Sequence, residues 1–339
     1  MNLRIKPLLF VLLLFSCVHK NSTIEEPRKV YRWPVMGTFF EIQWQSTFKD
    51  QDAISNQIFE IIREVDDKVS IYKQYSDLSL LNQHAGDGKW IPIHPITHQL
   101  IRLSFLYERK TKGNFNIGMG SLLKLWGLFL PVHGMEKTIP MGEKIKETMP
   151  LLDLTHIEIE EGRAKLNKAG MVLDMGGIAK GYALDLGIQL AKKYDVPCGY
   201  MNLGRQMMVM GSCATPLQFA IQNPEHTEQI VATVSLSEGS ISTTGDYEKY
   251  FVHKGQSYSH ILDPTSGEPV QNDLHSVSVW MQDAAGADVL STTLFVMGYE
   301  KGKQFAQKYH DSIGIYWIFK GRKPEYQNSK YGKIMLTEK

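Results

Sequence analysis

An apolar run that ends in a carboxylate and two glycines constrains the fold of this chain more than any other segment. Residues 171–174 are apolar up to Asp174, Gly176 and Gly177 follow, and a helical pattern then opens with Ala183, Leu184, Leu186 and Leu190. This order predicts a strand, a tight turn and a helix N-terminus, whose N–H groups and dipole favour an anion such as phosphate. A strand-to-helix turn without a ligand explains the segment equally well. The segment matches neither G-x-G-x-x-G nor Walker A, so a standard dinucleotide or nucleoside-triphosphate site is not indicated.

A second segment combines a buried helix with two hard oxygen donors. Residues 284–294 are small and apolar, yet Asp288 and Thr292 lie four residues apart and therefore on one helical face. A carboxylate and a hydroxyl so placed can bind Mg²⁺, which needs few protein ligands because water and phosphate complete its shell. A hydrogen bond between Asp288 and Thr292 within the helix is the simpler interpretation.

A histidine near a strong turn signal is the candidate general base. His260 lies shortly before Asp263-Pro264-Thr265-Ser266-Gly267, and Asp-Pro-x-x-Gly favours a turn. We therefore expect His260 on a strand that runs into this turn, where an imidazole can accept a proton near neutral pH. A purely structural histidine is the alternative.

Composition indicates an ordinary globular protein. The 37 Lys+Arg and 36 Asp+Glu leave a net charge of +1, so no general attraction to nucleic acid is expected. No repeat and no Ser- or Pro-rich linker divides the 339 residues. We expect one α+β domain over residues 30–339, with mixed or antiparallel sheets and packed helices. Amphipathic helices are predicted at residues 53–69 and 96–110, a loop at 127–142, short strands within 151–167, and strands at 30–33, 38–44, 218–222, 230–236, 247–253 and 275–281.

The N-terminus predicts export. Arg4 and Lys6 precede an apolar run at residues 8–15, which is too short to span a bilayer but typical of a signal peptide. Residues 14–17 also resemble a bacterial lipoprotein box, in which Cys17 is lipidated. We expect a signal peptide at 1–16, a lipidated tether at 17–29 and a membrane-anchored protein facing the periplasm. The alternative is an ordinary secretory signal. Cys198 and Cys213 remain in a compartment that permits a disulfide.

The order of these motifs resembles the ApbE family of FAD:protein FMN transferases, which are exported flavin-transferring lipoproteins. The resemblance extends from about Met36 to Gly298. The matching blocks are Met36-Gly37-Thr38, residues 70–72 with 76–82, Phe115-Asn116 through Leu125-Trp126-Gly127, residues 174–182, Asn202-Leu203-Gly204, residues 244–247 with 259–264, and Asp288 with Thr292.

The resemblance implies a Mg²⁺-dependent transfer of the FMN half of FAD to a Thr or Ser hydroxyl of an acceptor flavoprotein, with release of AMP. The acceptors are expected among subunits of membrane redox complexes. By similarity, Asp288, Thr292 and the Gly177 carbonyl hold the metal, and His260 is the base. The residues that match the family's FAD site are Met36, Tyr72, Asn116, Ile117, Gly118, Asp174, Lys180 and Ile261. A Mg²⁺-dependent FAD pyrophosphatase and a non-catalytic FAD-binding lipoprotein are the alternative functions.

Three residues depart from the family pattern. Asn116 stands where the family usually has Asp, and Lys124 where it usually has Asn. Arg205 replaces the second glycine of an Asn-Leu-Gly-Gly motif. This arginine either reshapes the pocket or offers a guanidinium to phosphate. Because the metal ligands and His260 are retained, we expect an active enzyme with an altered balance of transfer and hydrolysis.

Overall fold

Strands from both ends of the chain form one large sheet in the computed structural model, which describes residues 29–129, 134–247 and 250–336. The sheet has eight strands in the order β1-β2-β7-β8-β11-β14-β15-β16, and every neighbouring pair is antiparallel. The bounds of these strands are β1 Val30–Val35, β2 Thr38–Trp44, β7 Gly199–Leu203, β8 Gln206–Met210, β11 Ser240–Gly245, β14 Leu274–Met281, β15 Gly314–Phe319 and β16 Glu325–Gln327.

Three small sheets surround the large one. Their orders are β17-β10-β9, β13-β12-β4 and β3-β6-β5. The bounds are β3 Ile91–Pro92, β4 Met135–Glu136, β5 Ile157–Glu160, β6 Arg163–Leu166, β9 Leu217–Gln222, β10 Ile230–Leu236, β12 Tyr250–His253, β13 Gln256–Ser259 and β17 Gly332–Leu336.

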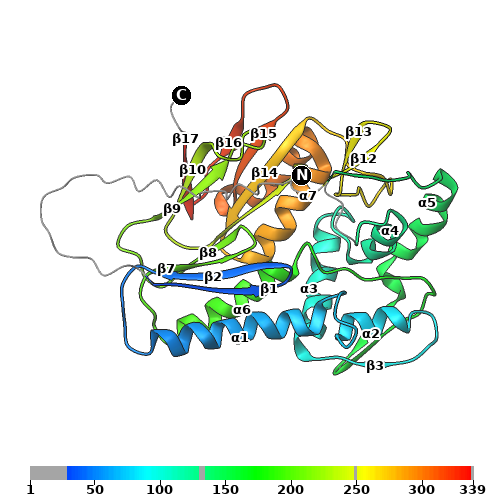
Figure 1. Ribbon diagram of the computed structural model, residues 1–339, viewed down its shortest axis with the longest axis horizontal. Helices are drawn as coiled ribbons and strands as arrows, with labels where there is room; N and C mark the ends of the chain where they lie inside the picture. Colours follow the sequence, from blue (N-terminus) through cyan, green and yellow to red (C-terminus); the bar gives the residue numbers. More distant parts are fainter. Residues whose placement is uncertain (1–28, 130–133, 248–249, 337–339) are drawn as a thin grey trace, which may run out of the picture.

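Helices cover the large sheet and connect it to the smaller ones. Their bounds are α1 Gln51–Val69, α2 Asp77–Gln83, α3 Pro95–Lys110, α4 Gly120–Leu125, α5 Gly142–Thr148, α6 Ala179–Lys193 and α7 Ala284–Ala306, with 3₁₀ turns at Ile117–Met119, Met149–Leu152, Leu154–His156 and Gln307–Ser312. Helix α1 packs on α6, α6 packs on α7, and α7 packs on β11 and β14. In Figure 1, α6 lies between α1 and the strands β7 and β8, so the main apolar core is sealed between these layers.

The fold confirms the predicted α+β class and most predicted elements. The helices expected at 53–69 and 96–110 correspond to α1 and α3, and the strand expected at 230–236 is β10. The strand expected at residues 171–174 is wrong, because this segment has no neighbouring strand. Side chains satisfy its backbone instead: the Asn82 amide donates to the Leu173 carbonyl (2.9 Å) and accepts from the Leu173 N–H (2.7 Å), and Ser121 Oγ accepts from Val172 N–H (2.9 Å).

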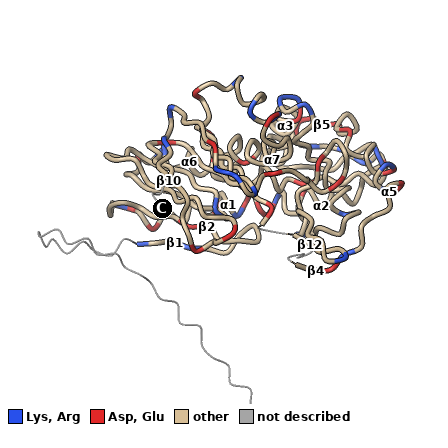
Figure 2. Tube along the Cα trace, turned by 90° about the horizontal axis from the view of Figure 1, so that it is seen from above, with Lys and Arg blue, Asp and Glu red and all other residues tan. Residues whose placement is uncertain are grey.

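Charges of both signs are interspersed along the described trace (Figure 2). This distribution agrees with the balanced composition. Among the described helices, none is both long enough and apolar enough to cross a membrane.

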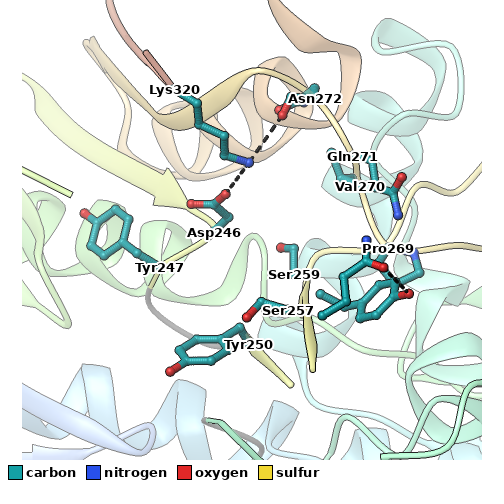
Figure 3. A pocket seen from close by; sticks show the side chains of 12 residues that line it. Asp246, Tyr247, Tyr250, Ser257, Ser259, Pro269, Val270, Gln271, Asn272 and Lys320 are labelled. Atoms are coloured by element: carbon teal, nitrogen blue, oxygen red, sulfur yellow. Dashed lines mark hydrogen bonds and ion pairs between the residues drawn. The ribbon is translucent and has the colours of Figure 1, made fainter. Parts of the chain in front are cut away.

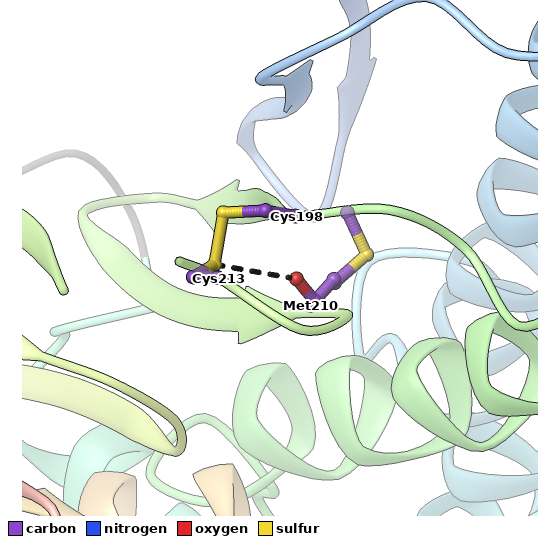
Figure 4. Close-up of a disulfide and its surroundings, with 3 residues drawn as sticks. All are labelled: Cys198, Met210 and Cys213. Carbon is purple, nitrogen blue, oxygen red and sulfur yellow. Dashed lines mark hydrogen bonds between the residues drawn. A yellow bond between two sulfur atoms is a disulfide. The ribbon is translucent and has the colours of Figure 1, made fainter. Parts of the chain in front are cut away.

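A disulfide between Cys198 and Cys213 joins the ends of the β7–β8 hairpin (Figure 4). The two cysteines are 15 residues apart, so the bond closes a loop whose entropy in the unfolded chain is worth about 3 kcal/mol. We expect reduction to lower the free energy of unfolding by about this amount in urea titrations with and without dithiothreitol. The Cys198→Ser/Cys213→Ser variant is the control, and its stability should not respond to the reductant. An equal stability of the reduced and oxidised wild-type chain would contradict this prediction.

Candidate functional site

The carboxylate of Asp288 is the centre of the candidate site. It is buried in the second turn of α7 and faces the first turn of α6. Its oxygens lie 3.3 and 3.5 Å from Lys180 Nζ, 3.3 Å from the Gly181 N–H and 3.5 Å from Ser242 Oγ on β11. These contacts are long for charge-assisted hydrogen bonds, which are typically about 2.7–2.9 Å. Asp288 is therefore a buried carboxylate that is only loosely satisfied by the protein.

A glycine in α6 allows this arrangement. A Cβ atom on Gly181 would lie only 2.3 Å from the carbonyl oxygen of Ala284, so no larger residue permits α6 to approach the start of α7 this closely. The close approach brings Lys180 and the Gly181 N–H against Asp288, although they are more than 100 residues apart in the chain. The glycine thus serves the geometry of the site.

Hydroxyl groups extend the site along α7. Thr292 Oγ1 lies 3.0 Å from Thr244 Oγ1 at the end of β11, and Thr244 Oγ1 also lies 2.9 Å from Ser291 Oγ. Asp288 and Thr292 do not bond to each other, so the simpler interpretation of their spacing is wrong. Both side chains instead face β11, where they present a carboxylate and hydroxyls on one side of the helix.

The glycine turn adjoins Asp288 through Lys180. Asp174 Oδ1 accepts a hydrogen bond from the Gly176 N–H (3.0 Å), and Lys180 Nζ donates to the Gly176 carbonyl (3.1 Å) while it pairs with Asp288. Gly177 follows in the same turn, before α6 begins at Ala179. The structure therefore brings together four predicted residues: Asp174, Gly177, Lys180 and Asp288.

The segment at Asn116 is tied to the same turn. The Asp174 N–H donates to the Ile117 carbonyl (2.8 Å), and Gly118 N–H donates to Asn116 Oδ1 (2.7 Å). Asn116 Nδ2 donates to the Leu152 carbonyl (2.9 Å), a bond that an ionised aspartate cannot make because it has no donor. The neutral residue at position 116 therefore has a structural use in this chain.

Tyr72 lies near the glycine turn, and Met36 lies between β1 and β2. Tyr72 is 73% exposed, and its hydroxyl donates to the Phe129 carbonyl (3.1 Å). Shielding of the hydroxyl from solvent and, to a smaller extent, the Asp174 carboxylate raise the pKa of Tyr72, which indicates that the two groups are neighbours. Met36 occupies the β1–β2 turn with a left-handed φ of 51°.

The β1–β2 turn lies beside the β7–β8 turn that contains Arg205. The Gly204 N–H donates to the Phe39 carbonyl (3.3 Å), and β2 pairs with β7. Arg205 has φ of 72°, a conformation that costs a non-glycine residue about 1–2 kcal/mol. An arginine in place of the glycine that the family usually has here therefore strains the backbone. Lys124, the third departure, is an exposed residue of α4.

The expectation that His260 lies on a strand is wrong, because β13 ends at Ser259 and His260 is the next residue; Ile261 after it is buried. The turn that follows is confirmed, because Asp263 Oδ1 accepts from the Thr265 N–H and hydroxyl (2.7 Å each). Asp246 is likewise engaged, 2.7 Å from Lys320 Nζ and 3.3 Å from His275 Nδ1. Asp263 and Asp246 therefore both hold hydrogen-bond or ion-pair partners in this structure, and Figure 3 shows Asp246 with Lys320.

Three contributors to the site are not among the candidate residues predicted from the sequence. Ser242 and Thr244 lie on β11, and nothing in the sequence distinguishes their hydroxyls from those of other strands. Their contacts with Asp288 and Thr292 become apparent only because β11 packs against α7. Asp185 carries a usable signal, because it is the single acidic residue of α6 and lies between Leu184 and Leu186.

Asp185 should make the stability of the protein depend on pH. It accepts hydrogen bonds from the N–H groups of Ala284 (2.7 Å) and Ala285 (2.9 Å), yet burial outweighs these donors and raises its pKa to about 7. The folded protein thus holds this proton more tightly than the unfolded chain does. The resulting stabilisation is complete below about pH 4 and is lost as the pH rises through about 7.

We expect the free energy of unfolding of the wild-type protein to fall by a few kcal/mol, in order of magnitude, between about pH 4.5 and about pH 7.5 as Asp185 ionises. Asp185→Asn should show a smaller loss over the same interval in urea titrations, because an amide does not titrate. An identical pH slope in the two proteins would show that Asp185 ionises normally.

Several known proteins are similar to this chain in sequence. The model of the ApbE family matches residues 36–317. The chain is 28% identical over 279 residues to the FAD:protein FMN transferase of Vibrio cholerae. The aligned region covers 81% of this chain and 83% of the relative. It is 29% identical over 297 residues to the protein of the same name from Escherichia coli K12, with coverages of 84% and 82%.

Solved structures show the same fold. The ApbE protein of Thermotoga maritima superposes with a TM-score of 0.79 at 27% identity and covers 90% of this chain and 97% of its own. The flavin transferase ApbE of Vibrio cholerae superposes with a TM-score of 0.75 at 26% identity, with coverages of 90% and 98%.

Proposed function

This chain belongs to the ApbE family, and on that basis we propose that it is an FAD:protein FMN transferase. It transfers the FMN half of FAD to a Ser or Thr hydroxyl of an acceptor flavoprotein and releases AMP. The hydroxyl oxygen forms a bond to the FMN phosphorus as the bond between this phosphorus and the AMP phosphate oxygen breaks. The hydroxyl proton passes to a base, and AMP leaves with the bridging oxygen.

One observation carries this proposal: a buried, loosely paired carboxylate, a row of hydroxyls and a glycine turn before a helix converge from three separate elements. Asp288 and Thr292 come from α7, Thr244 from β11, and Gly177 and Lys180 from the turn and first residues of α6. Phosphoryl transfer depends on neutralising the charge of phosphate oxygens. We propose that Lys180 Nζ and the N–H groups at the start of α6 do so.

The donors around Asp288 fit Mg²⁺. A carboxylate oxygen, a hydroxyl and a backbone carbonyl are hard ligands, and the long contacts of Asp288 leave its oxygens available to a cation. No cluster of three or more His, Cys, Asp or Glu occurs among the described residues, so a cation here would depend on substrate phosphate and water for its remaining ligands. We propose that Asp288, Thr292 and the Gly177 carbonyl hold the ion, which would neutralise pyrophosphate charge when bound.

The surrounding residues can hold FAD. We propose that Tyr72 and Met36 contact its rings, since an exposed tyrosine and a methionine offer flat and adaptable apolar surfaces. Asn116, Ile117, Gly118, Asp174 and Lys180 form one hydrogen-bonded unit with the glycine turn, and Ile261 follows the base. We propose that His260 accepts the proton of the acceptor hydroxyl.

Incubation of the purified protein with FAD and Mg²⁺, with and without an acceptor, tests this function. AMP formed with covalent flavin on the acceptor identifies a transferase. AMP and free FMN formed equally well without an acceptor identify a pyrophosphatase, and intact bound FAD identifies a binding protein. Either of the last two results would overturn the proposal.

We further propose that the protein is an exported lipoprotein anchored by Cys17, with a signal peptide at 1–16, a tether at 17–29 and the domain at 30–339. Cys17 lies outside the described residues. The Cys198–Cys213 disulfide supports the proposal, because disulfides persist in oxidising compartments such as the periplasm.

We expect Cys17→Ser to release the protein from membranes or to block its processing, because the acyl chains would be lost and stable anchoring needs more than one. Fractionation of cells that express each form, followed by immunoblotting, measures this. Cys213→Ser is the matched control and should stay in the membrane fraction. A Cys17→Ser protein that remains fully membrane-bound would contradict the lipoprotein proposal.

A further inference from the structure

The first residues of α7 are held by side chains from two other elements. The Asp185 carboxylate of α6 accepts a hydrogen bond from the Ala284 N–H (2.7 Å) on one oxygen and from the Ala285 N–H (2.9 Å) on the other. Gln206 Nε2 of β8 donates to the Ala284 carbonyl (2.6 Å). Ala284, Ala285 and Gln206 are buried, so these bonds are shielded from water. The start of α7 is therefore fixed to both α6 and β8.

Helix α7 also has a cap of its own. Asp283 is its N-cap residue, and its Oδ1 accepts from the Gly286 N–H (2.6 Å). The first N–H groups of a helix have no partner inside the helix, and water could satisfy those of Ala284 and Ala285 wherever the helix lay. Asp283 moves with α7, whereas Asp185 belongs to α6. The two bonds to Asp185 therefore do what the cap cannot do: they set the position of α7 relative to α6.

Asp185 and the candidate site lie one turn apart on both helices. Asp185 follows Gly181 by four residues in α6. Asp288 follows Ala284 by four residues in α7. Residues at this spacing share a helical face and are separated by about 6 Å along the axis. The bond between Asp185 and Ala284 is therefore the neighbour, one turn away, of the 3.3 Å bond that Asp288 accepts from α6. A shift of α7 that broke the first would also change the second.

The proposed Mg²⁺ site tolerates little displacement of α7. Mg²⁺ requires nearly octahedral geometry with ligands at about 2.0–2.1 Å. Asp288 and Thr292 belong to α7, whereas the Gly177 carbonyl belongs to the turn before α6. The three ligands therefore meet only when α6 and α7 keep one relative position. The contacts of Asp288 with α6 are long, at 3.3–3.5 Å, and the shorter bonds of Asp185 hold that position better.

We propose that Asp185 is a positioning residue of the metal site: by bonding to the first residues of α7 it holds Asp288 and Thr292 in place against the glycine turn. It acts through these ligands and touches neither the ion nor the substrate. This inference rests on the proposed function, because it requires that Asp288 binds a cation. Side chains that orient metal ligands from outside typically contribute about 10–100-fold to metal affinity. Loss of Asp185 should therefore weaken ion binding by more than a general loss of stability does.

Asp185→Ala and Asp185→Asn are the test variants, and Asp283→Ala is the matched control. Alanine at position 185 removes both bonds to α7. Asparagine keeps one acceptor, but its NH₂ group faces the second N–H as a donor, so one bond is lost. Asp283→Ala removes the cap of the same helix and also lowers stability, but it leaves the bonds between α6 and α7 in place. Urea titration of each variant measures the loss of stability.

Binding of Mn²⁺ is the main readout, because it does not depend on turnover. Mn²⁺ takes the same hard oxygen ligands as Mg²⁺, and electron paramagnetic resonance measures the free ion. The FAD-loaded protein is titrated without acceptor at about pH 8, where Asp185 is ionised because its pKa is about 7.

We expect the Kd for Mn²⁺ to rise at least about tenfold in Asp185→Ala and at least about threefold in Asp185→Asn. In Asp283→Ala it should stay within about twofold of the wild-type value, because that variant keeps the bonds to α6. The Kd for FAD, measured without metal by flavin fluorescence, should change by less than about twofold in all three variants.

Two results would overturn the inference. One is that the folded Asp185 variants bind Mn²⁺ as tightly as the wild-type protein does. The other is that Asp283→Ala loses as much affinity as Asp185→Ala, since the effect then follows from destabilisation of α7 alone. Should Asp185→Ala not fold, the isosteric Asp185→Asn decides the question by the same comparison.

Asp288→Ala separates this inference from the proposed function. If that variant binds Mn²⁺ as tightly as the wild-type protein does, the proposed ligand set is wrong and the inference fails with it. A wild-type protein that binds Mn²⁺ through Asp288 but transfers no flavin overturns the transferase function and leaves the positioning role of Asp185 standing.

Discussion

Asp288→Ala is expected to abolish FMN transfer, with a fall in kcat of at least about 10³-fold, while the protein stays folded. Its carboxylate contacts Lys180, Ser242 and the Gly181 N–H at the start of α6, so its removal takes away the charged ligand of the proposed Mg²⁺ site. Loss of several kcal/mol of charge stabilisation corresponds to a rate effect of this order. AMP release at saturating Mg²⁺ measures it.

Asp288→Asn separates the charge from the hydrogen bonds. The amide oxygen can still accept from the Gly181 N–H, which now bonds to Oδ2, and the amide nitrogen, in the place of Oδ1, can donate to Ser242 Oγ. The neutral amide binds a divalent cation poorly. We expect both variants to be inactive and to have lost tight Mg²⁺ binding in titration calorimetry. A folded Asp288→Asn protein with normal turnover would reduce Asp288 to a structural hydrogen-bond acceptor.

His260→Ala is expected to bind FAD and Mg²⁺ normally and to lose FMN transfer by about 10²–10⁴-fold. A serine or threonine hydroxyl is a weak nucleophile, and a positioned base contributes a factor of this size. In the wild-type protein the rate should fall as the pH is lowered, because a protonated imidazole cannot accept the hydroxyl proton. Steady-state kinetics across a pH series, with FAD affinity measured by flavin fluorescence, checks both statements.

His253→Ala is the matched control for His260→Ala. His253 belongs to the same hairpin, and its Nδ1 lies 2.8 Å from the Lys137 carbonyl, so its loss perturbs the hairpin without removing the candidate base. We expect it to keep transfer within about tenfold of the wild-type rate. If His260→Ala instead loses FAD affinity and keeps its turnover at saturating FAD, His260 is a binding residue. The base would then have to be Asp246 or Asp263, each freed from its present partners.

Local patterns explain which elements were predictable. The apolar spacing of residues 53–69 and 96–110 requires only that one helical face be buried, and α1 and α3 follow it. The turn at Asp263 is also local, since its carboxylate bonds to Thr265 two residues later. The prediction of a strand at residues 171–174 is wrong because an apolar run does not specify which groups bond to its backbone. In this chain the partners are side chains from distant segments, such as Asn82.

The sequence by itself determined the residue types of the site, the amphipathic helices and, through the order of its motifs, the family. Each of these depends on chemistry that is readable within a few neighbouring residues. Only the tertiary structure decided that Lys180 and Gly181 face Asp288, that Thr244 meets Thr292, and that Asp185 bonds to the first residues of α7. These contacts join segments up to about 100 residues apart, and they exist because α6, α7 and β11 pack together, which no local pattern specifies.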